Sequence, residues 1–391
     1  VLGSATPSLE AYYRAGKGEY RMFQLTRRLT GGELPTVYTV DLRQELQEGN
    51  RSIFSRKLQE LMTDRLNKGQ QTILFLNRRG YAGFVSCRSC GEVMKCPHCD
   101  VSLSEHKGGR LICHYCGYTQ PMPKLCPKCG SKYILGFKAG TQQIEEKLKE
   151  LYPGVRTLRM DADTTRTKDS YEKILSSFAN GEADVLIGTQ MIVKGHDFPK
   201  VTLVGILAAD LSLNASDYRA GERTFQLLTQ AVGRAGRGAL PGEAVIQTYQ
   251  PDHYAITCAA AQDYESFYQE EILYRELSGY PPVAHMLAVQ IYGKEEENVK
   301  QLALRLTDVV KSNMDFLSGK QKEQSNKKIQ VLGPAPANIS KINDIYRYVF
   351  YVKHAEYDVL VEVKDRLEET LRQWQPRQMS IQFDFDPVSV L

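Results

Sequence analysis

The sequence predicts an α/β protein with a parallel sheet, an inserted cysteine-rich module and a following α+β unit. Apolar, β-branched runs at 185–188 and 201–207 alternate with amphipathic segments, which is the pattern of a buried parallel sheet. Eight of the nine cysteines fall between residues 87 and 129, in four C-x-x-C pairs. The last third of the chain has a different order of elements, βαββαβ.

Length and composition set the limits of this prediction. A chain of 391 residues is long enough for two or three domains with large cores. The net charge of +4 permits a nucleic-acid partner but does not indicate one. No apolar run reaches the roughly 18 residues of a membrane span, and no signal peptide is evident, so we expect a cytoplasmic protein. The chain opens on VLGSATPS without Met, so we expect a piece of a longer protein.

The first segment, 1–22, combines a strand end with a short helix. Small and hydroxyl-bearing residues follow the strand, and the helix is expected to end at Gly16. An ordinary capped helix would explain this pattern. The string also resembles helicase motif III, the segment that couples the nucleotide site to DNA, through Gly3, Ser4, Ala5 and Thr6. No phosphate loop of the form G-x-x-x-x-G-K-[ST] occurs in the sequence.

The next segment, 23–86, is predicted to begin the parallel sheet. A strand at 36–43 precedes an amphipathic helix over 52–68 and a buried strand at 73–76. Asn77, Arg78 and Arg79 follow that strand. The two arginines are either contacts to a nucleic-acid backbone or solvated residues at a strand end.

The cysteine pairs predict metal. Each C-x-x-C pair brings two thiolates to one tetrahedral ion, so eight cysteines predict two structural zinc sites with four ligands each. Disulfides are the competing interpretation, but nothing marks this chain as secreted, and a reducing compartment favours metal. The ninth cysteine, Cys258, lies far away and is expected to be a buried free thiol.

The four pairs can combine in three ways. The 13 residues between Cys99 and Cys113 suit a β-hairpin, whereas only five residues join the first two pairs. This spacing favours a nested arrangement, with a crossed one as the alternative. The nested arrangement groups Cys96, Cys99, Cys113 and Cys116 on one ion and Cys87, Cys90, Cys126 and Cys129 on the other.

The sheet is predicted to resume at 133–261. Its strand at 185–188 is followed by the loop GTQMIVKGHD, which carries a Lys and an acid. Ligands bind to such loops because they lie at the carboxyl edge of the parallel strands. The loop residues of interest are Gly188, Thr189, Lys194, Gly195 and Asp197.

A helix over about 221–232 then leads into QAVGRAGRG. Arg234 and Arg237 are three residues apart, so both guanidiniums share one face, and the small residues between them leave room for a phosphate. A surface Arg-Gly run that touches RNA or nothing would explain the string alone. Together with Gln230 and Gly233 and the preceding loop, it resembles motif VI in the second, RecA-like lobe of a superfamily 2 helicase, with motif V before it.

Residues 262–391 are predicted to form a separate unit. A Tyr-rich helix leads through SGYPP into a βαββαβ order, which is a ferredoxin-like layout. Tyr346, Tyr348 and Phe350 alternate with Arg347 along one strand. These aromatic residues either stack on exposed bases or, as is more common, form the core beneath two helices.

Strings spread over nearly the whole chain carry a family resemblance. They are GSATPS, LFLNRRGYAGF with the cysteine insertion behind it, GTQMIVKGHDFPKVTLV, QAVGRAGR, SGYPPVAHM and GPAPA. Together they resemble the PriA family of bacterial primosomal helicases, also called protein N′. The cysteine insertion is the most specific part, because motifs V and VI alone would fit many helicases.

The resemblance implies an ATP-dependent 3′-to-5′ DNA helicase that uses Mg²⁺ and restarts replication at stalled or abandoned forks. It implies branched and single-stranded DNA, single-strand-binding protein, primosome proteins and the replicative helicase or its loader as partners, at the bacterial nucleoid and without a membrane. It also implies the nested zinc pairing. The expected domains are 1–22 (end of lobe one), 23–86 with 133–261 (lobe two), 87–132 (zinc insertion) and 262–391 (C-terminal domain).

Two further hypotheses stay open at this stage. Without a phosphate loop, we expect the chain alone not to hydrolyse ATP, so it could serve as a zinc-dependent module that docks partners and branched DNA. An RNA helicase is the third and weaker interpretation, because the cysteine insertion argues against it.

Overall fold

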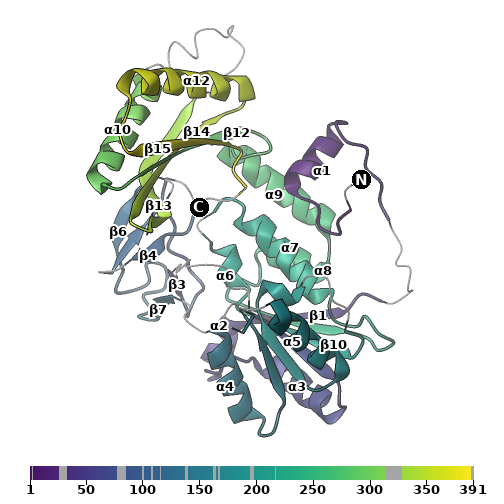
Figure 1. The fold of residues 1–391 in the computed structure, drawn as a ribbon. Coiled ribbons are helices and arrows are strands. Elements are labelled where there is room, and N and C mark those ends of the chain that lie inside the picture. Colours follow the sequence, from purple (N-terminus) through teal and green to yellow (C-terminus); the bar gives the residue numbers. More distant parts are fainter. Residues whose placement is uncertain are drawn as a thin grey trace.

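The chain folds into an α/β lobe, a cysteine-rich module and a C-terminal α+β domain (Figure 1). This confirms the predicted fold class. The computed structural model describes residues 1, 3–25, 33–76, 85–98, 101–106, 109–114, 116–136, 140–161, 164–165, 168–193, 198–215, 217–312 and 328–388.

A six-stranded sheet, parallel throughout, forms the centre of the α/β lobe. Its order is β1-β11-β10-β2-β9-β8. The central strands are buried on both faces, which explains why their sequences are continuously apolar rather than alternating. The strands are β1 (Thr36–Asp41), β2 (Gln71–Leu76), β8 (Thr157–Met160), β9 (Val185–Gly188), β10 (Val201–Leu207) and β11 (Glu243–Thr248).

Helices cover both faces of this sheet. On one face α3 (Arg56–Asn67) and α4 (Thr141–Leu151) pack against Leu74, Ile187 and Val245. On the other, α5 (Lys168–Asn180), α7 (Ala220–Val232), α8 (Tyr254–Ala261) and α9 (Tyr264–Ser278) share a core with Phe75, Leu186 and Ile246. Short helices α2 (Leu42–Gln47), α6 (Asp210–Leu213) and η1 (Gln190–Val193) follow β1, β10 and β9.

One predicted helix begins later than its sequence suggests. The prediction starts at residue 52, but α3 starts at Arg56, because Ser55 is its N-cap and accepts a hydrogen bond from the amide of Leu58 at 3.3 Å. Asn50 and Ser52 instead make turn hydrogen bonds within 50–54.

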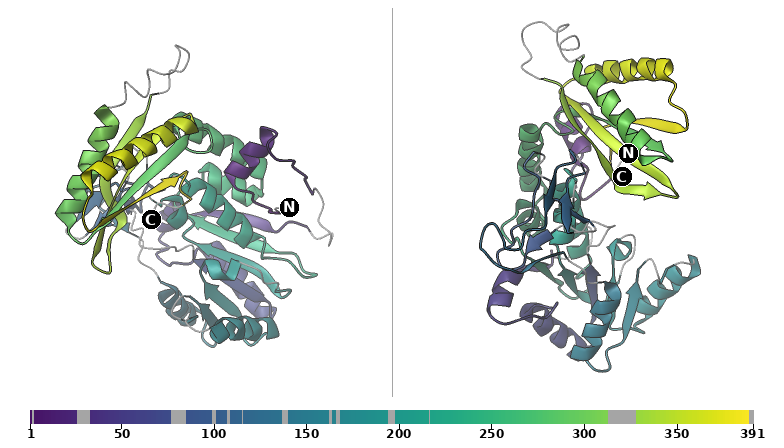
Figure 2. Two further views of the ribbon diagram at one scale, coloured as in Figure 1. Left: turned by 45° about the horizontal axis from the view of Figure 1, so that its top comes forward. Right: turned by 90° about the vertical axis from the view of Figure 1, so that its left-hand side faces the viewer.

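The cysteine-rich module is inserted after β2, at the carboxyl edge of the parallel sheet. It contains two small antiparallel sheets, one of two strands and one of three. The strands are β3 (Val85–Cys87), β4 (Ser104–His106), β5 (Arg110–Ile112), β6 (Thr119–Pro121) and β7 (Ile134–Gly136). The module lies between the α/β lobe and the C-terminal domain (Figures 1 and 2).

The C-terminal domain has the predicted ferredoxin-like order. Its antiparallel sheet runs β13-β14-β12-β15. Leu287, Val289 and Phe350 face the two helices, whereas Met286, Ala288 and Tyr351 face the cysteine-rich module. The elements are β12 (His285–Gly293), α10 (Glu296–Ser312), β13 (Gln330–Ile342), β14 (Ile345–His354), α12 (Tyr357–Trp374) and β15 (Met379–Phe385).

The amino-terminal segment docks on the α/β lobe rather than extending the sheet. Helix α1 (Leu9–Gly16) lies against α9, where the Tyr12 ring is 5.0 Å from Tyr264 and 4.5 Å from Tyr268. Among the described residues, no helix combines the length and apolar character needed to cross a bilayer.

Candidate functional site

The arginine pair lies at the carboxyl end of α7. Arg234 is half-buried and Arg237 is exposed, with its Nε donating to the carbonyl of Gly233 at 2.9 Å. The turn after the helix needs glycines: Gly236 has φ of +68°, and a Cβ at Gly238 would lie 2.4 Å from the carbonyl oxygen of Pro199. The chain directly after Arg237 is therefore held close to the loop that precedes β10.

The loop after β9 approaches the same place. Gly188 ends β9 where a Cβ would lie 2.3 Å from Ile192 and 2.6 Å from the carbonyl of Met160, so only glycine fits. Thr189 is half-buried, and η1 behind it packs against α7. The amide of Gly236 donates to the carbonyl of Val201 at 3.0 Å, which ties the arginine turn to β10. Lys194, Gly195 and Asp197 lie outside the described residues.

The GSATPS segment meets the arginine helix. Thr6 is buried, and its Oγ1 accepts a hydrogen bond from Nε2 of Gln230 at 3.4 Å. The Thr6 amide is held by Oγ of Ser4 at 3.1 Å, whereas Gly3 and Ala5 are exposed. Residues 224 positions apart in the chain thus meet at the end of α7 that carries the arginines.

The cysteines form two groups. Cys87, Cys90, Cys126 and Cys129 have all their Sγ atoms within 4.8 Å of one another, and Cys96, Cys113 and Cys116 form the second group. Cys99 lies outside the described residues. The described cysteines are therefore grouped in the nested way and not in the crossed way.

The first group fits a tetrahedral metal ion. Its Cys87–Cys129 and Cys90–Cys126 sulfur pairs are each 3.6 Å apart, and Cys96–Cys116 in the second group is 3.5 Å apart. Four ligands at zinc–sulfur distances of about 2.3 Å would be separated by about 3.8 Å. Burial acts to raise the pKa of Cys87, but hydrogen bonds from the backbone amides of Cys90 and Ser89, with those from the Cys129 and Cys90 thiols, lower that pKa to about 7, whereas burial raises the pKa of Cys90 to about 12. The spacing of the sulfur atoms is therefore what suits this group to a tetrahedral metal ion.

The first cysteine group rests on the α/β lobe. A Cβ at Gly91 would lie 2.4 Å from the carbonyl oxygen of Tyr249, and the guanidinium of Arg88 lies over the Tyr249 ring at 4.9 Å. Nη1 of Arg43 donates to the carbonyl of Cys90 at 3.5 Å. The contact therefore lies at the carboxyl ends of β1 and β11.

The second cysteine group rests on the C-terminal domain instead. His114 is buried, its Nδ1 lies 3.1 Å from the carbonyl of Pro336, and its Nε2 lies 3.0 Å from Nε2 of His106. A Cβ at Gly117 would lie 3.4 Å from the carbonyl of Pro334. The second cysteine group therefore packs against the GPAPA string, which lies on β13.

The aromatic row on β14 is largely core. Phe350 is fully buried and Tyr348 is 8% exposed, both beneath the helices of the C-terminal domain. Base stacking by these two residues is therefore excluded, and the alternative of a helix-covered core is correct for them. Tyr346 is half-buried, with Nζ of Lys341 4.8 Å from its ring centre.

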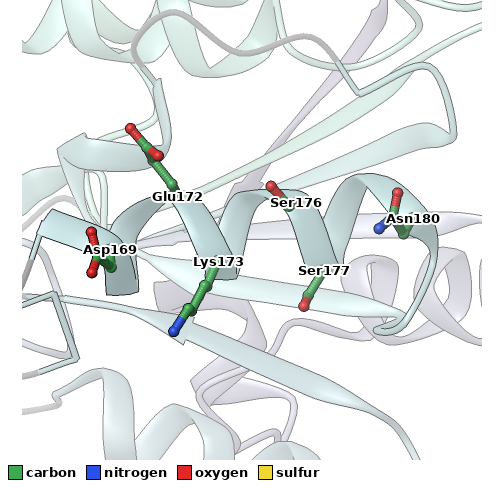
Figure 3. Close-up of a pocket in the computed structure, with 6 residues that line it drawn as sticks. All are labelled: Asp169, Glu172, Lys173, Ser176, Ser177 and Asn180. Atoms are coloured by element: carbon green, nitrogen blue, oxygen red, sulfur yellow. The ribbon is translucent and has the colours of Figure 1, made fainter.

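A shallow hollow lies along α5, away from the site. Figure 3 shows its lining side chains, which are polar or charged and come from this one helix. They are Asp169, Glu172, Lys173, Ser176, Ser177 and Asn180. None of the predicted site residues lines it.

Sequence reasoning missed a buried ionic cluster beside the site. Arg275 on α9 contacts Glu222 on α7 and Glu271, and all three side chains are almost fully buried. The Glu271 and Arg275 spacing of i, i+4 resembles an ordinary exposed helix pair. No sequence signal distinguishes it, because its burial depends on α7 from elsewhere in the chain.

Fold and site together define a class of protein. A parallel α/β lobe with an arginine-bearing helix end beside a strand-end loop is the C-terminal lobe of a helicase, and residues 125–239 match the helicase conserved C-terminal domain. Residues 96–121 match the PriA DNA helicase Cys-rich region domain, and residues 276–388 match the primosomal protein N C-terminal domain. The chain belongs to the PriA family of replication restart proteins.

Similar proteins support this membership along the whole chain. Replication restart protein PriA of Bacillus subtilis is 44% identical over 393 aligned residues, covering 100% of this chain and 48% of that protein. PriA of Synechocystis is 41% identical over 399 residues, covering 100% of this chain and 46% of that protein. The chain therefore spans about half the length of the curated relatives it matches. A solved structure, a single-substitution variant of S. cerevisiae Dbp5 bound to RNA and ADP BeF3, aligns over 70% of this chain and 54% of its own at 13% identity with a TM-score of 0.33.

Proposed function

We propose that this chain is part of an ATP-dependent 3′-to-5′ DNA helicase that restarts replication at stalled or abandoned forks. Two observations support this role: the family membership, and the hydrogen bond from Gln230 to Thr6, which joins the arginine helix to the GSATPS segment. In this proposal residues 1–22 end motor lobe one, while 23–86 with 133–261 form lobe two. The zinc insertion is 87–132. The C-terminal domain follows the SGYPP linker, so the boundary expected at 262 lies too early, because α9 (Tyr264–Ser278) packs in the core of the α/β lobe.

The arginine pair would act on the nucleotide. ATP with Mg²⁺ would bind in the cleft between the lobes, with Arg237 and Arg234 at the γ-phosphate. Water attacks the γ-phosphorus, the bond to the bridging oxygen breaks, and ADP leaves with the electron pair. Two fixed guanidiniums stabilise the negative charge that spreads over the transferring group, and Gln230 is the third catalytic residue. Gly233 lies in the turn that presents the two arginines.

The neighbouring segments would couple this chemistry to DNA. Thr189 with Lys194 would grip the backbone of one strand, and Gly188, Gly195 and Asp197 would shape their loop. Closure of the lobes would be transmitted to Gln230 through the segment formed by Gly3, Ser4, Ala5 and Thr6. Repeated closing and opening of the lobes then steps the protein along one strand.

Two structural zinc ions would hold the cysteine-rich module. Cys87, Cys90, Cys126 and Cys129 would bind one ion, and Cys96, Cys99, Cys113 and Cys116 the other. Closed sites with four thiolates leave no position for a reactive water, so their contribution is to folding. The cysteine-rich region and the sulfur geometry support zinc as the metal.

The proposed partners follow from the role at a fork. They are branched and single-stranded DNA, single-strand-binding protein, primosome proteins and the replicative helicase or its loader. A protein with this role works on the nucleoid in the bacterial cytoplasm.

The decisive experiment measures ATP hydrolysis by the full-length protein with and without forked DNA. Arg237→Ala is expected to lower stimulated turnover about 10³-fold, as removal of an arginine finger does. Arg372→Ala, on the exposed face of α12, is the matched control and should leave turnover unchanged. Near-normal turnover in Arg237→Ala would contradict the assignment. A wild-type protein that no DNA stimulates would favour the docking-module hypothesis, and stimulation by RNA alone would favour an RNA helicase.

A further inference from the structure

Arg275 on α9 is a fully buried arginine that contacts three separate parts of the chain. Its Nε donates to Oε1 of Glu271 at 2.8 Å, its Nη1 donates to the carbonyl of Pro281 at 2.7 Å, and its Nη2 lies 3.2 Å from Oε2 of Glu222. A guanidinium presents its donors in one rigid plane, so these contacts fix its position completely.

Glu222 carries the contact toward the amino-terminal segment. Its Oε1 accepts the backbone amide of Leu9 at 2.9 Å, and Leu9 is the first residue of α1, directly after GSATPS. Glu222 lies in the first turn of α7, while Gln230 lies in its last turn and contacts Thr6 at 3.4 Å. Both ends of α7 therefore hold the same short segment, Thr6–Leu9.

Pro281 carries the contact toward the C-terminal domain. It belongs to the SGYPP string, whose Tyr280 stacks on Tyr218 with ring centres 4.6 Å apart and planes 8° apart. Nζ of Lys353, on β14, lies 4.1 Å from the Tyr280 ring centre. The guanidinium of Arg275 lies 4.8 Å from the Tyr218 ring centre. The string that links the two domains thus packs on the ionic cluster itself.

The close approach of α9 to α7 depends on a glycine. A Cβ at Gly221 would lie 2.6 Å from Oε2 of Glu271 and 2.9 Å from the hydroxyl of Tyr254. That hydroxyl donates to the same Glu271 oxygen at 2.7 Å. The contact between Arg275 and Glu222 therefore forms only when α7 and α9 lie at this separation.

We propose that Arg275 is a positioning residue. Through its contacts, the position of the GSATPS segment depends on how the C-terminal domain packs against the α/β lobe. Through Glu222 it fixes Leu9, and through the Pro281 carbonyl it contacts the linker to β12. Movement of the C-terminal domain on DNA then changes how Thr6 meets Gln230. This inference rests on the proposed function for its consequence in ATP hydrolysis, but not for the physical link.

The physical link can be tested in the 391-residue chain by hydrogen exchange. Arg275→Lys keeps the charge but cannot reach three partners from one ammonium group, and Glu222→Gln keeps an acceptor for Leu9 while removing the charge. Both are expected to speed amide exchange in residues 5–10 about tenfold or more, the loss expected for a hydrogen bond to a charged group. Exchange in β9 and β10 should stay as in the wild type.

The matched control is Arg65→Lys. Arg65 is also buried and also pairs with two acids, Asp64 and Glu243, but it lies on α3, across the sheet from α7. Its substitution should leave exchange at 5–10 unchanged. If Arg275→Lys and Glu222→Gln also leave it unchanged, or if Arg65→Lys speeds it equally, the proposal is overturned.

A second readout separates positioning from mere stability. In the full-length protein, Arg275→Lys is expected to lower DNA-stimulated kcat about tenfold, with KM for ATP and the DNA-free rate unchanged. Equal losses with and without DNA would show a purely structural role and contradict the proposal. A wild type without any ATPase activity would contradict the proposed function, while the exchange result would still decide the link through Arg275.

Discussion

Gly91 lies against Tyr249 so closely that a Cβ on Gly91 would be 2.4 Å from the Tyr249 carbonyl oxygen. Gly91 directly follows Cys90 and has φ of +78°, a conformation that side chains with a Cβ rarely adopt. The first cysteine group is therefore pressed onto the carboxyl end of β11. Gly117 and Gly130 follow cysteines in the same way, but they have different surroundings.

These three glycines predict a ranking of stability loss on substitution by alanine. Gly130 has φ of +69° and nothing within 4 Å, so Gly130→Ala should cost about 1 kcal/mol from backbone conformation alone. Gly117→Ala adds an approach of 3.4 Å to the Pro334 carbonyl and should cost slightly more. Gly91→Ala adds a clash with backbone and should cost about 2–4 kcal/mol. Denaturant midpoints of the zinc-loaded chain measure the series, and equal losses at all three positions would contradict the close contact.

Removal of metal should loosen two contacts rather than unfold the whole chain. The cysteine-rich module meets the α/β lobe at Tyr249 and the C-terminal domain at Pro334 and Pro336, and a module without metal loses its fixed shape. Chelation should release about two zinc ions per chain and speed hydrogen exchange at β11 and β13, with β9 and β10 unchanged. If chelation speeds hydrogen exchange equally along the whole chain, or does not speed it at all, this prediction is wrong.

The sequence predicted most of the fold because its patterns are local. Continuous apolar strands, capped helices and the βαββαβ order depend on neighbouring residues, and Val201–Leu207 is a clear example of a fully buried strand. The nested grouping of the cysteines followed from loop lengths. The start of α3 was misplaced because Ser52 and Ser55 are both good caps, and only tertiary packing selects Ser55.

Docking between domains was not predictable in the same way. Alternation along β14 placed Tyr348 and Phe350 on one face, but it could not say that α10 and α12 cover this face and the cysteine-rich module the other. The SGYPP and GPAPA strings marked a family without revealing their contacts. Their roles depend on Arg275 and His114, which lie in distant segments and resemble ordinary residues in the sequence.

The contact between Thr6 and Gln230 should matter for activity more than for stability. Its hydrogen bond is long, 3.4 Å, so Thr6→Val or Gln230→Ala should change the free energy of unfolding by less than about 1 kcal/mol. Each should lower DNA-stimulated ATP turnover in the full-length protein about tenfold, equivalent to about 1.4 kcal/mol of barrier. Gln142→Ala, an exposed glutamine on α4, serves as the control.

The double variant provides the sharper test of the same contact. If Thr6 and Gln230 act only through each other, Thr6→Val combined with Gln230→Ala should be no slower than either single variant. If the double variant instead loses turnover by the product of the two single losses, the two side chains act independently. The coupling assigned to their hydrogen bond would then be wrong.

His253 predicts a loss of stability in mild acid. Burial, with a smaller contribution from Lys95, lowers the pKa of this histidine to about 4, while its Nδ1 accepts the Ala255 amide at 3.2 Å as the N-cap of α8. Because the unfolded chain binds a proton at ordinary histidine pKa and the folded chain does not, stability falls as the pH drops below about 6.5 and levels off near 4. The loss between about pH 7 and pH 5 should be about 2 kcal/mol. His253→Asn keeps a good N-cap without a titrating group, so its stability should fall less over this range. Metal release in acid affects both proteins alike. The difference between their denaturation curves therefore isolates the contribution of His253. Parallel pH profiles of the two proteins would show that the pKa of His253 is not depressed.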